Sequence, residues 1–577
     1  MKNFTADFET CTWLEDETYV WAWALCEIGN EDNIQIGTDI NSFFELCKQY
    51  NNPKIFFHNL KFDGSFLINY LLDNGYKLIK EKEEIAEKTF QCIISDLGAF
   101  YQIIVYEKYY KSKIRKITFI DSLKIINMSV KDIAKTFNLP ISKLEIDYNL
   151  FRERDHQLTD EEKEYIKNDV KIVALALNEL FKEKLTKTTA AANALGYYKQ
   201  ITGRQKFEHY FPTLTFEEDS LIRPAYKGRF TYLNPIYSSA HEDRTVENVY
   251  ILDVNSLYPS VMRYEMLPYG KPVYFEGQYK DNKLYPLYIQ TLKCKFKTKK
   301  NKIPTIQIKE KNLFFASNEY IEDSGDKAFM LTLTNIDLEL FFDHYEVEDL
   351  EYIDGFMFRG IEGLFNEYID YWTEKKIEAG KQGNKGKRTI AKLQLNSLYG
   401  KFAKSTYTKS KYPFIGPDGL IHYTMSEAKQ ENGIYVPIAA FITSLARRKT
   451  IQTSQAIKEY SLEHYGKDMY IYSDTDSIHT TLPIEECQKF CQIDDFKLGY
   501  WAHEGTAQRG KFVRQKCYIE EIDEKIKITC AGLPERCYDQ VTWDNFKEGF
   551  TAHGKLTYKY VKGGVKLVET DFTIKEG

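Results

Sequence analysis

The alternation of hydrophobic and polar positions distinguishes the first 190 residues from the rest of the chain. Short apolar runs with strand character, such as YVWAWALC, KIFFHN and ITFIDSL, alternate there with helical patterns. The longest helical pattern covers 159–185 and opens with Thr159 and Glu162, which have the spacing of a capping box. This arrangement predicts an α/β domain over residues 1–190.

Beyond about residue 250 the strand-like runs are longer and richer in Tyr, Ile and Val. Between 363 and 403 the pattern is helical, and GKQGNKGK at 380–387 predicts a turn between two antiparallel helices. A second strand-rich region follows. Because 577 residues exceed a single core, we expect roughly three to five domains of α/β and α+β type.

The composition is ordinary for a globular protein, except that aromatic residues make up 15% of the chain. Aromatic rings fill cores, and they also stack on nucleic-acid bases. A net charge of −6 does not exclude a nucleic-acid partner, because binding depends on where the cations lie. The basic run KCKFKTKKNK at 293–302 by itself favours a solvated edge strand or hairpin.

The ten cysteines contain no C-x-x-C pair and no zinc-like spacing, which is typical of reduced intracellular thiols. The residues after Met1 do not resemble a signal peptide. The longest apolar run, VPIAAFITSLA at 436–446, is too short to span a bilayer. We therefore expect a cytosolic protein.

Acidic residues occur in pairs inside strand-like runs. In YSDTDS, Asp474 and Asp476 would share one face of a strand, where two carboxylates repel each other unless a cation lies between them. Asp7 and Glu9 in DFE have the same spacing. A β-turn is the alternative for Asp-Thr-Asp, since that sequence suits one.

Further acids extend this pattern to two groups. Asp253 follows the apolar YIL and joins the late pair, whereas Asp63 in HNLKFDG and Asp169 in YIKND join the early one. Tyr165 lies four residues before Asp169, on the same face of a helix. Each acid alone could belong to a turn or a surface helix. Together, such oxygen ligands suit Mg²⁺ or Mn²⁺, and paired ions support in-line phosphoryl transfer.

A cationic stripe complements the acids. Arg388, Lys392, Asn396 and Tyr399 are spaced to share one face of a helix, and residues 387–402 contain no acid. The cations could hold a triphosphate while the tyrosine ring stacks on a base pair, and Lys376 could add a phosphate contact. A solvated basic helix is the alternative.

These motifs, taken in order, resemble those of family B DNA polymerases. DFE, HNLKFDG and YIKND are similar to the three exonuclease motifs, and DVNSLYPS, KLQLNSLYG and YSDTDS to polymerase motifs A, B and C. Lys516-Cys517-Tyr518 matches the K-x-Y motif. The length and the wording of HNLKFDG resemble the protein-primed branch of small phages with linear genomes. IPTIQIK followed by NEY (303–320) lies where that branch carries its first terminal-protein-region insertion.

The resemblance implies a ribonuclease-H-like 3′–5′ exonuclease domain and a right-hand polymerase domain. The expected layout is exonuclease 1–190, palm 191–264 and 435–535, first insertion 265–362, fingers 363–403, second insertion 404–434 and thumb 536–577.

The resemblance also implies roles in a polymerase site. Asp253 and Asp476 would bridge two Mg²⁺ ions, which Mn²⁺ can replace, with the Val254 carbonyl as a further ligand and Asp474 nearer the primer end. Tyr258 matches the steric gate that selects deoxynucleotides. The incoming nucleotide would be held by Lys376, Arg388, Lys392, Asn396 and Tyr399.

In the exonuclease domain, the resemblance implies a four-acid proofreading site of Asp7, Glu9, Asp63 and Asp169. Tyr165 would orient the attacking water and Lys143 would neutralise the scissile phosphate. Glu145 is a further acid that could contact a metal ion. The positions that match contacts to a single-stranded primer end are Thr10, His58, Asn59, Phe62, Phe66, Ser122 and Leu123.

The loop AYKGRF (225–230) departs from the family pattern. Tyr226 and Gly228 match a template-binding loop, but Arg229 stands where the family has Gly or Ala. If a left-handed backbone is needed there, Arg costs on the order of 1 kcal/mol or more. Alternatively, Arg229 adds a phosphate contact. Lys516 and Tyr518 are the remaining expected DNA contacts.

The implied activity is DNA synthesis with proofreading, strand displacement and protein-primed initiation, in the cytoplasm of an infected host. The implied partners are template and primer DNA, dNTPs, a terminal protein and a single-strand DNA-binding protein; the chain would act as a monomer or as a heterodimer with the terminal protein. The alternatives are a nucleic-acid-primed family B polymerase, an exonuclease with a weakened polymerase site, and a non-catalytic single-strand-binding protein. Intact acids in both groups argue against the last two.

Overall fold

The computed structural model describes residues 1–307 and 320–576. Most of the sequence signature expected for the first insertion, between IPTIQIK and NEY, lies outside the described residues. Among the described helices, none has the length and apolar content needed to cross a bilayer.

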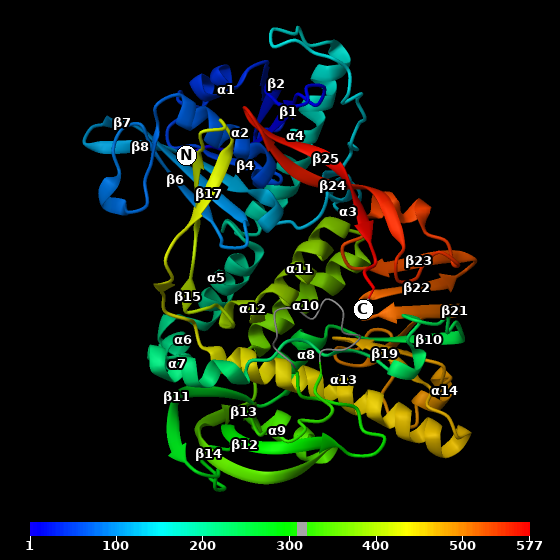
Figure 1. The fold of residues 1–577 in the computed structure, drawn as a ribbon. Helices are drawn as coiled ribbons and strands as arrows, with labels where there is room; N and C mark the ends of the chain where they lie inside the picture. The colour runs from blue at the N-terminus through cyan, green and yellow to red at the C-terminus, as the bar shows by residue number, and fades with distance from the viewer. Residues whose placement is uncertain (308–319, 577) are drawn as a thin grey trace.

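The N-terminal domain is a mixed sheet with helices packed on it, as the sequence predicts (Figure 1). The strand order is β3-β2-β1-β4-β8-β7-β6-β5. Its strands are β1 Asn3–Thr10, β2 Val20–Glu27, β3 Ile34–Gly37, β4 Lys54–Phe57, β5 Lys77–Leu78, β6 Thr89–Ile94, β7 Phe100–Tyr110 and β8 Lys113–Asp121. Its helices are α1 Ile40–Cys47, α2 Leu60–Asp73, α3 Val130–Thr136 and α4 Asp160–Lys182.

The predicted capping box opens α4. Thr159 accepts a hydrogen bond from the backbone of Glu162, and the Glu162 side chain accepts one from the backbone of Thr159. Buried Arg152 donates to the same Glu162 carboxylate over 2.5 Å. This contact ties the irregular segment 138–158 to the start of the helix.

A seven-stranded antiparallel sheet forms the centre of the molecule, in the order β23-β22-β21-β10-β20-β19-β9. Its strands are β9 Thr231–Leu233, β10 Val246–Val254, β19 Tyr470–Asp474, β20 Ser477–Thr480, β21 Trp501–Arg514, β22 Cys517–Ile522 and β23 Lys525–Cys530. The helices α8 Leu257–Tyr264 and α13 Val436–Tyr465 pack together, and α13 also contacts β19 and β20. The short helix α14 Ile484–Cys487 follows β20.

The helices α5 Ala190–Thr202, α6 Arg204–Tyr210 and α7 Phe216–Ile222 connect the first domain to this sheet. The expected helical hairpin is α10 Asn366–Lys381 and α11 Lys385–Ser397, followed by α12 Tyr399–Phe402. The turn between α10 and α11 is at 382–384, where Gly383 has φ +68°, so the predicted turn is confirmed.

A four-stranded sheet, ordered β11-β14-β12-β13, precedes the helical hairpin in the chain. It comprises β11 Leu267–Glu276, β12 Leu287–Thr298, β13 Phe329–Thr334 and β14 Tyr345–Ile361, with α9 Asn335–His344. The basic run 293–302 is mostly in β12, which is an interior strand, so the predicted edge position is wrong. Its lysines alternate with buried Leu292, Cys294 and Phe296, which is why an interior strand can be so basic.

Two long projections reach the N-terminal domain (Figure 1). One holds the small strand pairs β15 Tyr407–Thr408 with β18 Lys429–Gln430, and β16 Lys411–Ile415 with β17 Ile421–Met425. The other is the hairpin β24 Thr551–Val561 and β25 Gly564–Thr573, which contacts α2.

The C-terminal hairpin is fitted closely to the N-terminal domain. Thr18 donates its backbone N–H to the Lys562 carbonyl over 2.9 Å. A Cβ at Gly563 would lie 2.2 Å from the Thr18 carbonyl oxygen, and one at Gly564 would lie 2.7 Å from the Phe66 ring. Only glycine fits at this junction without a shift of the two parts. The expected domain boundaries remain predictions.

Candidate active sites

The early acids converge at the middle of the N-terminal sheet. Asp7 and Glu9 lie on one face of β1, Asp63 lies in the first turn of α2, and Asp169 lies on α4, which packs across β1. Carboxylate oxygens of Asp7, Glu9 and Asp169 are within 4.8 Å of one another. Three residues separated by up to 162 positions therefore meet, and Asp63 lines the same cavity beside them, as the sequence predicts.

Burial makes these carboxyls poor anions without a cation. It raises the pKa of Asp7 to about 7, and the Asp169 charge adds to the effect. Burial raises the pKa values of Glu9 and Asp63 well above their usual range, and Asp7 acts in the same direction on both. One oxygen each of Asp63 and Asp169 is buried without a hydrogen-bond partner among the described residues. The donor set therefore fits a divalent cation.

Lys143 forms an ion pair with this group of acids. Its Nζ donates to Asp169 Oδ2 over 2.6 Å and lies 5.3 Å from the centroid of the Tyr165 ring. The charge of Lys143 opposes the increase that burial causes in the pKa of Asp169. Lys143 and Tyr165 thus flank the carboxylates, as the sequence predicts. Glu145 is exposed and lies outside the three-residue metal-type group.

A cavity of about 830 Å³ opens onto the acids. Thr10, His58, Asn59 and Phe62 line it, and so are placed where a primer end could reach the carboxylates. Phe66 is not among the lining residues; it is 2% exposed and packs in the domain core. Ser122 and Leu123 also lie outside the lining.

Ser122 contacts the cavity-lining residue His58 without lining the cavity itself. Its hydroxyl bonds to His58 Nδ1 over 2.9 Å, while His58 Nε2 meets the Met128 carbonyl over 2.6 Å. Leu123 donates its backbone N–H to Asp121, which also accepts from the Asn59 backbone. These residues hold the His58-Asn59 turn in place.

The late acids meet at the end of the central sheet. Asp253 is next to the last residue of β10, and Asp476 lies in the turn between β19 and β20, where Thr475 has φ +57°. The Val254 N–H donates to the Asp476 carbonyl over 2.8 Å, which joins the two segments. The turn interpretation is therefore right for Asp476, and the prediction of a shared strand face is wrong because a left-handed residue separates the two acids.

Asp253 and Asp476 form the close pair, whereas Asp474 has other partners. Burial and the Asp476 charge raise the pKa of Asp253 to about 8. Burial also raises the pKa of Asp476. Asp474 accepts from Lys516 Nζ over 2.7 Å and from Thr231 Oγ1 over 3.2 Å.

The cationic stripe faces the Asp253 side. Arg388, Lys392 and Asn396 are exposed on α11, and Lys392 acts to lower the pKa of Asp253. Arg388 and Lys392 lower the pKa of Lys376 on α10, although burial contributes more. The mutual effect of these charges places the three cations near one another, opposite the half-buried Asp253.

Tyr399 is not in the same helix as the stripe. The helix α11 ends at Ser397, and Tyr399 begins the short α12. Its ring nonetheless stacks on Tyr258 of α8, with centroids 4.3 Å apart and planes at 20°. The two rings therefore form one platform beside the acids.

Comparison with known proteins gives this arrangement a family. The model of the family described as "DNA polymerase type B, organellar and viral" matches residues 45–491. The chain belongs to this family of type B DNA polymerases. The DNA polymerase of Bacillus phage Nf is 42% identical over the full length of both chains, and that of Bacillus phage phi29 is 39% identical over 100% of this chain and 99% of its own.

The fold is that of the phi29 enzyme. Its complex with primer-template DNA and incoming nucleotide substrates superposes with a TM-score of 0.91 at 38% identity, covering both chains completely. The expected exonuclease, palm, fingers and thumb architecture is thereby confirmed, as is the assignment of the chain as a DNA polymerase.

Two residues near the acids could not be identified from the sequence, because neither belongs to a recognisable motif. Tyr148 lies in the irregular segment before α4, lines the 830 Å³ cavity and bonds to the Tyr165 hydroxyl. Glu504 is the extra residue of a β-bulge in β21 opposite Ile251 and Leu252, and its charge raises the pKa of Asp253. Both are placed by contacts between distant segments.

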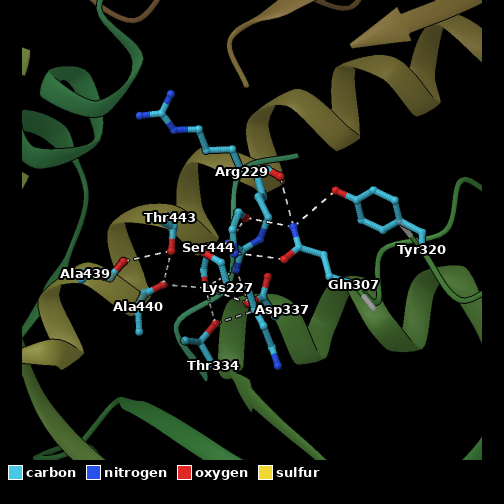
Figure 2. Close-up of polar contacts among 12 residues, drawn as sticks. Lys227, Arg229, Gln307, Tyr320, Thr334, Asp337, Ala439, Ala440, Thr443 and Ser444 are labelled. Atoms are coloured by element: carbon cyan, nitrogen blue, oxygen red, sulfur yellow. Dashed lines mark hydrogen bonds and ion pairs between the residues drawn. The ribbon is translucent and has the colours of Figure 1, made fainter. Parts of the chain in front are cut away.

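The backbone of loop 225–230 is held in place by hydrogen bonds to the side chains of Gln307 and Arg447 (Figure 2). The Gln307 amide accepts from the Gly228 N–H over 2.9 Å and donates to the Gly228 and Arg229 carbonyls over 2.9 and 3.1 Å. Buried Arg447 donates to the Lys227 and Gly228 carbonyls over 3.1 and 3.0 Å. Arg447 is held in turn by Asp337 through a 2.6 Å ion pair.

Arg229 is accommodated without left-handed strain, because it is not among the residues with positive φ. Its guanidinium lies 5.8 Å from the Tyr258 ring centroid, and Tyr399 and Tyr258 raise the pKa of Arg229 against the opposing effect of burial. The same charge acts to lower the pKa of Asp476. Burial raises the pKa of Tyr226, earlier in the loop, and the nearby Tyr399 acts in the same direction.

Lys516 and Tyr518 of the K-x-Y motif point into different surroundings. Lys516 occupies a two-residue turn with φ +54° and is exposed. The Tyr518 ring packs 5.1 Å from Tyr472 and 5.1 Å from Phe512. Lys516 is therefore the more solvent-exposed member of the motif.

Proposed function

We propose that this polymerase copies DNA from a template, corrects its product with a 3′–5′ exonuclease, displaces the non-template strand and starts from a protein hydroxyl. The observation that supports it is the presence of two separate groups of buried or half-buried acids in one chain. Each has a cation and an aromatic platform of its own. DNA polymerases use divalent metal ions, and we propose Mg²⁺ here, with Mn²⁺ as a substitute.

At the polymerase site, Asp253, Asp476 and the Val254 carbonyl would hold the ions, which when bound lower the pKa of the attacking hydroxyl and stabilise the charge on phosphorus. Arg388, Lys392 and Lys376 bind the triphosphate, and Asn396 completes this face. Tyr258 lies beneath the sugar, where its ring excludes a 2′-hydroxyl.

Two charges next to Asp474 organise the DNA in this proposal. Lys516 neutralises Asp474 and reaches the primer phosphates, while Arg229 adds a cation where its relatives are expected to have a small residue. Tyr226, Gly228 and Tyr518 guide the template and the growing pair. The fixed backbone of loop 225–230 keeps Arg229 aimed at this position.

At the exonuclease site, Asp7, Glu9, Asp63 and Asp169 would hold the ions, with the exposed Glu145 as a further acid that could contact a metal ion. Tyr165 orients the attacking water and Lys143 neutralises the scissile phosphate. The primer end is held along the cavity by Thr10, His58, Asn59 and Phe62, with Ser122, Leu123 and Phe66 supporting them.

The partners are template and primer DNA, dNTPs, a terminal protein and a single-strand DNA-binding protein, in the cytoplasm of an infected host. The phi29 enzyme in its ternary complex binds primer-template DNA and nucleotides, which supports the first two. The four-stranded sheet at 265–362 and the projection at 404–434 are the proposed terminal-protein regions. A pure nuclease is less well supported, because Asp253 and Asp476 are both in place.

The test uses a labelled primer–template with Mg²⁺, with and without the four dNTPs, and a duplex block ahead of the primer. We expect extension through the block with dNTPs and shortening without them. D476N should abolish extension alone, and D7A/D63A should abolish shortening alone. Loss of both activities in either folded variant would refute the division into two sites.

Protein priming requires its own test. The polymerase is mixed with purified terminal protein, labelled dNTP and template ends without any oligonucleotide. A labelled nucleotide covalently attached to the terminal protein is expected. Extension of oligonucleotides without any such product would favour the nucleic-acid-primed alternative.

A further inference from the structure

Cys517 and Cys530 face each other across two strands next to the K-x-Y turn. Cys517 opens β22 and Cys530 closes β23, and the two are paired in register. Their sulfur atoms are 3.7 Å apart. Both side chains are buried, at 6% and 7% exposure.

The strand register places this pair at a position that suits a covalent link. The Ala531 N–H donates to the Lys516 carbonyl over 2.9 Å, so the neighbouring pair of residues is the hydrogen-bonded type. Because the two types alternate along an antiparallel ladder, Cys517 and Cys530 form a non-hydrogen-bonded pair. Its Cα atoms are typically about 4.5 Å apart, within the range that disulfides span.

The surroundings prepare one of the thiols for reaction. A hydrogen bond from Cys517 lowers the pKa of Cys530, and the Arg514 charge acts in the same direction, while burial opposes both. Thiolates are the reactive form of cysteine, so Cys530 is the first nucleophile of the pair. Cys537 lies in the same apolar cluster, but its thiol donates to the His553 carbonyl.

We propose that Cys517 and Cys530 are an oxidation site at which a small peroxide forms a cross-strand disulfide. The Cys530 thiolate attacks one peroxide oxygen, the O–O bond breaks, and the sulfur becomes a sulfenic acid while hydroxide takes up a proton as water. The Cys517 sulfur then attacks the Cys530 sulfur; the S–S bond forms, the S–O bond breaks, and the thiol proton leaves with the hydroxide as a second water. One hydrogen peroxide thus oxidises two thiols and yields two waters.

The link would tie the strand that begins directly after Lys516 to β23. Lys516 donates to Asp474 and so connects this hairpin to the polymerase acids. The strands are already paired, so the disulfide suppresses their separation instead of changing their register. The oxidised hairpin should therefore open less often.

The first experiment is a peptide map of the full chain, reduced, treated with hydrogen peroxide, alkylated and digested with trypsin. Cleavage after lysine and arginine separates CYIEEIDEK (517–525), ITCAGLPER (528–536) and the peptide that starts at Cys537. We expect the first two peptides to be joined and to lack two hydrogen atoms. Two separately alkylated peptides, or a link to Cys537, would overturn the proposal.

The controls separate this pair from general oxidation. C537S should keep the link, because Cys537 has another partner, whereas C517S and C530S should lose it. Hydrogen exchange of the oxidised wild type should be at least tenfold slower than that of the reduced form across β22 and β23, with no change elsewhere. Equal exchange in the two forms of the wild type would refute the restraint on the hairpin, even if a serine variant fails to fold.

Discussion

Magnesium binding at the polymerase site should be coupled to the release of a proton. Burial and Asp476 raise the pKa of Asp253 to about 8 in the metal-free protein. A carboxyl of this pKa is about 90% protonated at pH 7 and about 10% protonated at pH 9. Since a cation takes the ionised form, binding should release about 0.9 proton at pH 7 and about 0.1 at pH 9.

The sign and size of the effect follow from that protonation. The proton competes with the cation below the raised pKa, so affinity for Mg²⁺ is weak at pH 7 and is gained as the pH rises through 8. The apparent association constant should increase about tenfold from pH 7 to pH 9, or about 1.4 kcal/mol. A lower affinity for Mg²⁺ at pH 9 than at pH 7 would contradict a raised pKa of Asp253.

The assay is isothermal titration with Mg²⁺ in two buffers of different ionisation enthalpy, which counts the protons released. It requires D7N/E9Q as the background, because burial also raises the pKa of Asp7 to about 7 and the second site would otherwise contribute. In that background, D253N should bind more weakly and lose the dependence on pH. Equal affinity at pH 7 and pH 9, or the same proton release with D253N, would refute the reasoning.

Three other substitutions test separate contacts. K516M removes the Lys516 partner of Asp474. Because Lys516 is more than half exposed, the free energy of unfolding should fall by less than about 1 kcal/mol. The slope of log K against log salt for primer–template binding, measured by anisotropy, should become smaller by about one ion. An unchanged slope would contradict a phosphate contact. R229G should change the free energy of unfolding by no more than about 1 kcal/mol because it relieves no left-handed backbone; a marked gain in melting temperature would contradict this. Because Arg229 is proposed to add a cation beside the DNA, primer–template binding measured by anisotropy should weaken. R152M removes Arg152 from the buried Glu162 carboxylate and leaves it only the His156 ring, at 2.7 Å, and the Thr159 backbone. The cost is up to about 3–5 kcal/mol, so 3′-end shortening should fall while extension persists; equal loss of both would contradict the local effect.

Short-range patterns in the sequence identify much of this fold. The capping box at Thr159, the turn near Gly383 and the α/β alternation of the first domain all depend on residues within a few positions of one another. The early acids Asp7 and Asp169 are assigned to one site through the resemblance of DFE and YIKND to exonuclease motifs, since strand and helix periods fix the face that each occupies but not that the two faces meet.

The remaining features depend on contacts that no local pattern contains. Asp476 lies in a turn because a left-handed residue follows β19, although the alternation of its neighbours also suits a strand. Glu504 reaches Asp253 through a bulge between strands some 250 positions apart in sequence. The resemblance predicts that the Phe66 ring contacts a primer end. The ring is instead buried, in part because the C-terminal hairpin packs on it at Gly564.

The hairpin of β24 and β25 has a consequence for how such enzymes can be recombined. It packs on α2 and contributes Tyr558, whose hydroxyl accepts a hydrogen bond from Asn59 over 3.0 Å. A chimera with a single crossover anywhere between residues 191 and 550 would take α2 from one parent and this hairpin from the other. The N-terminal domain and the last strands therefore form one unit of inheritance, although they stand at opposite ends of the chain.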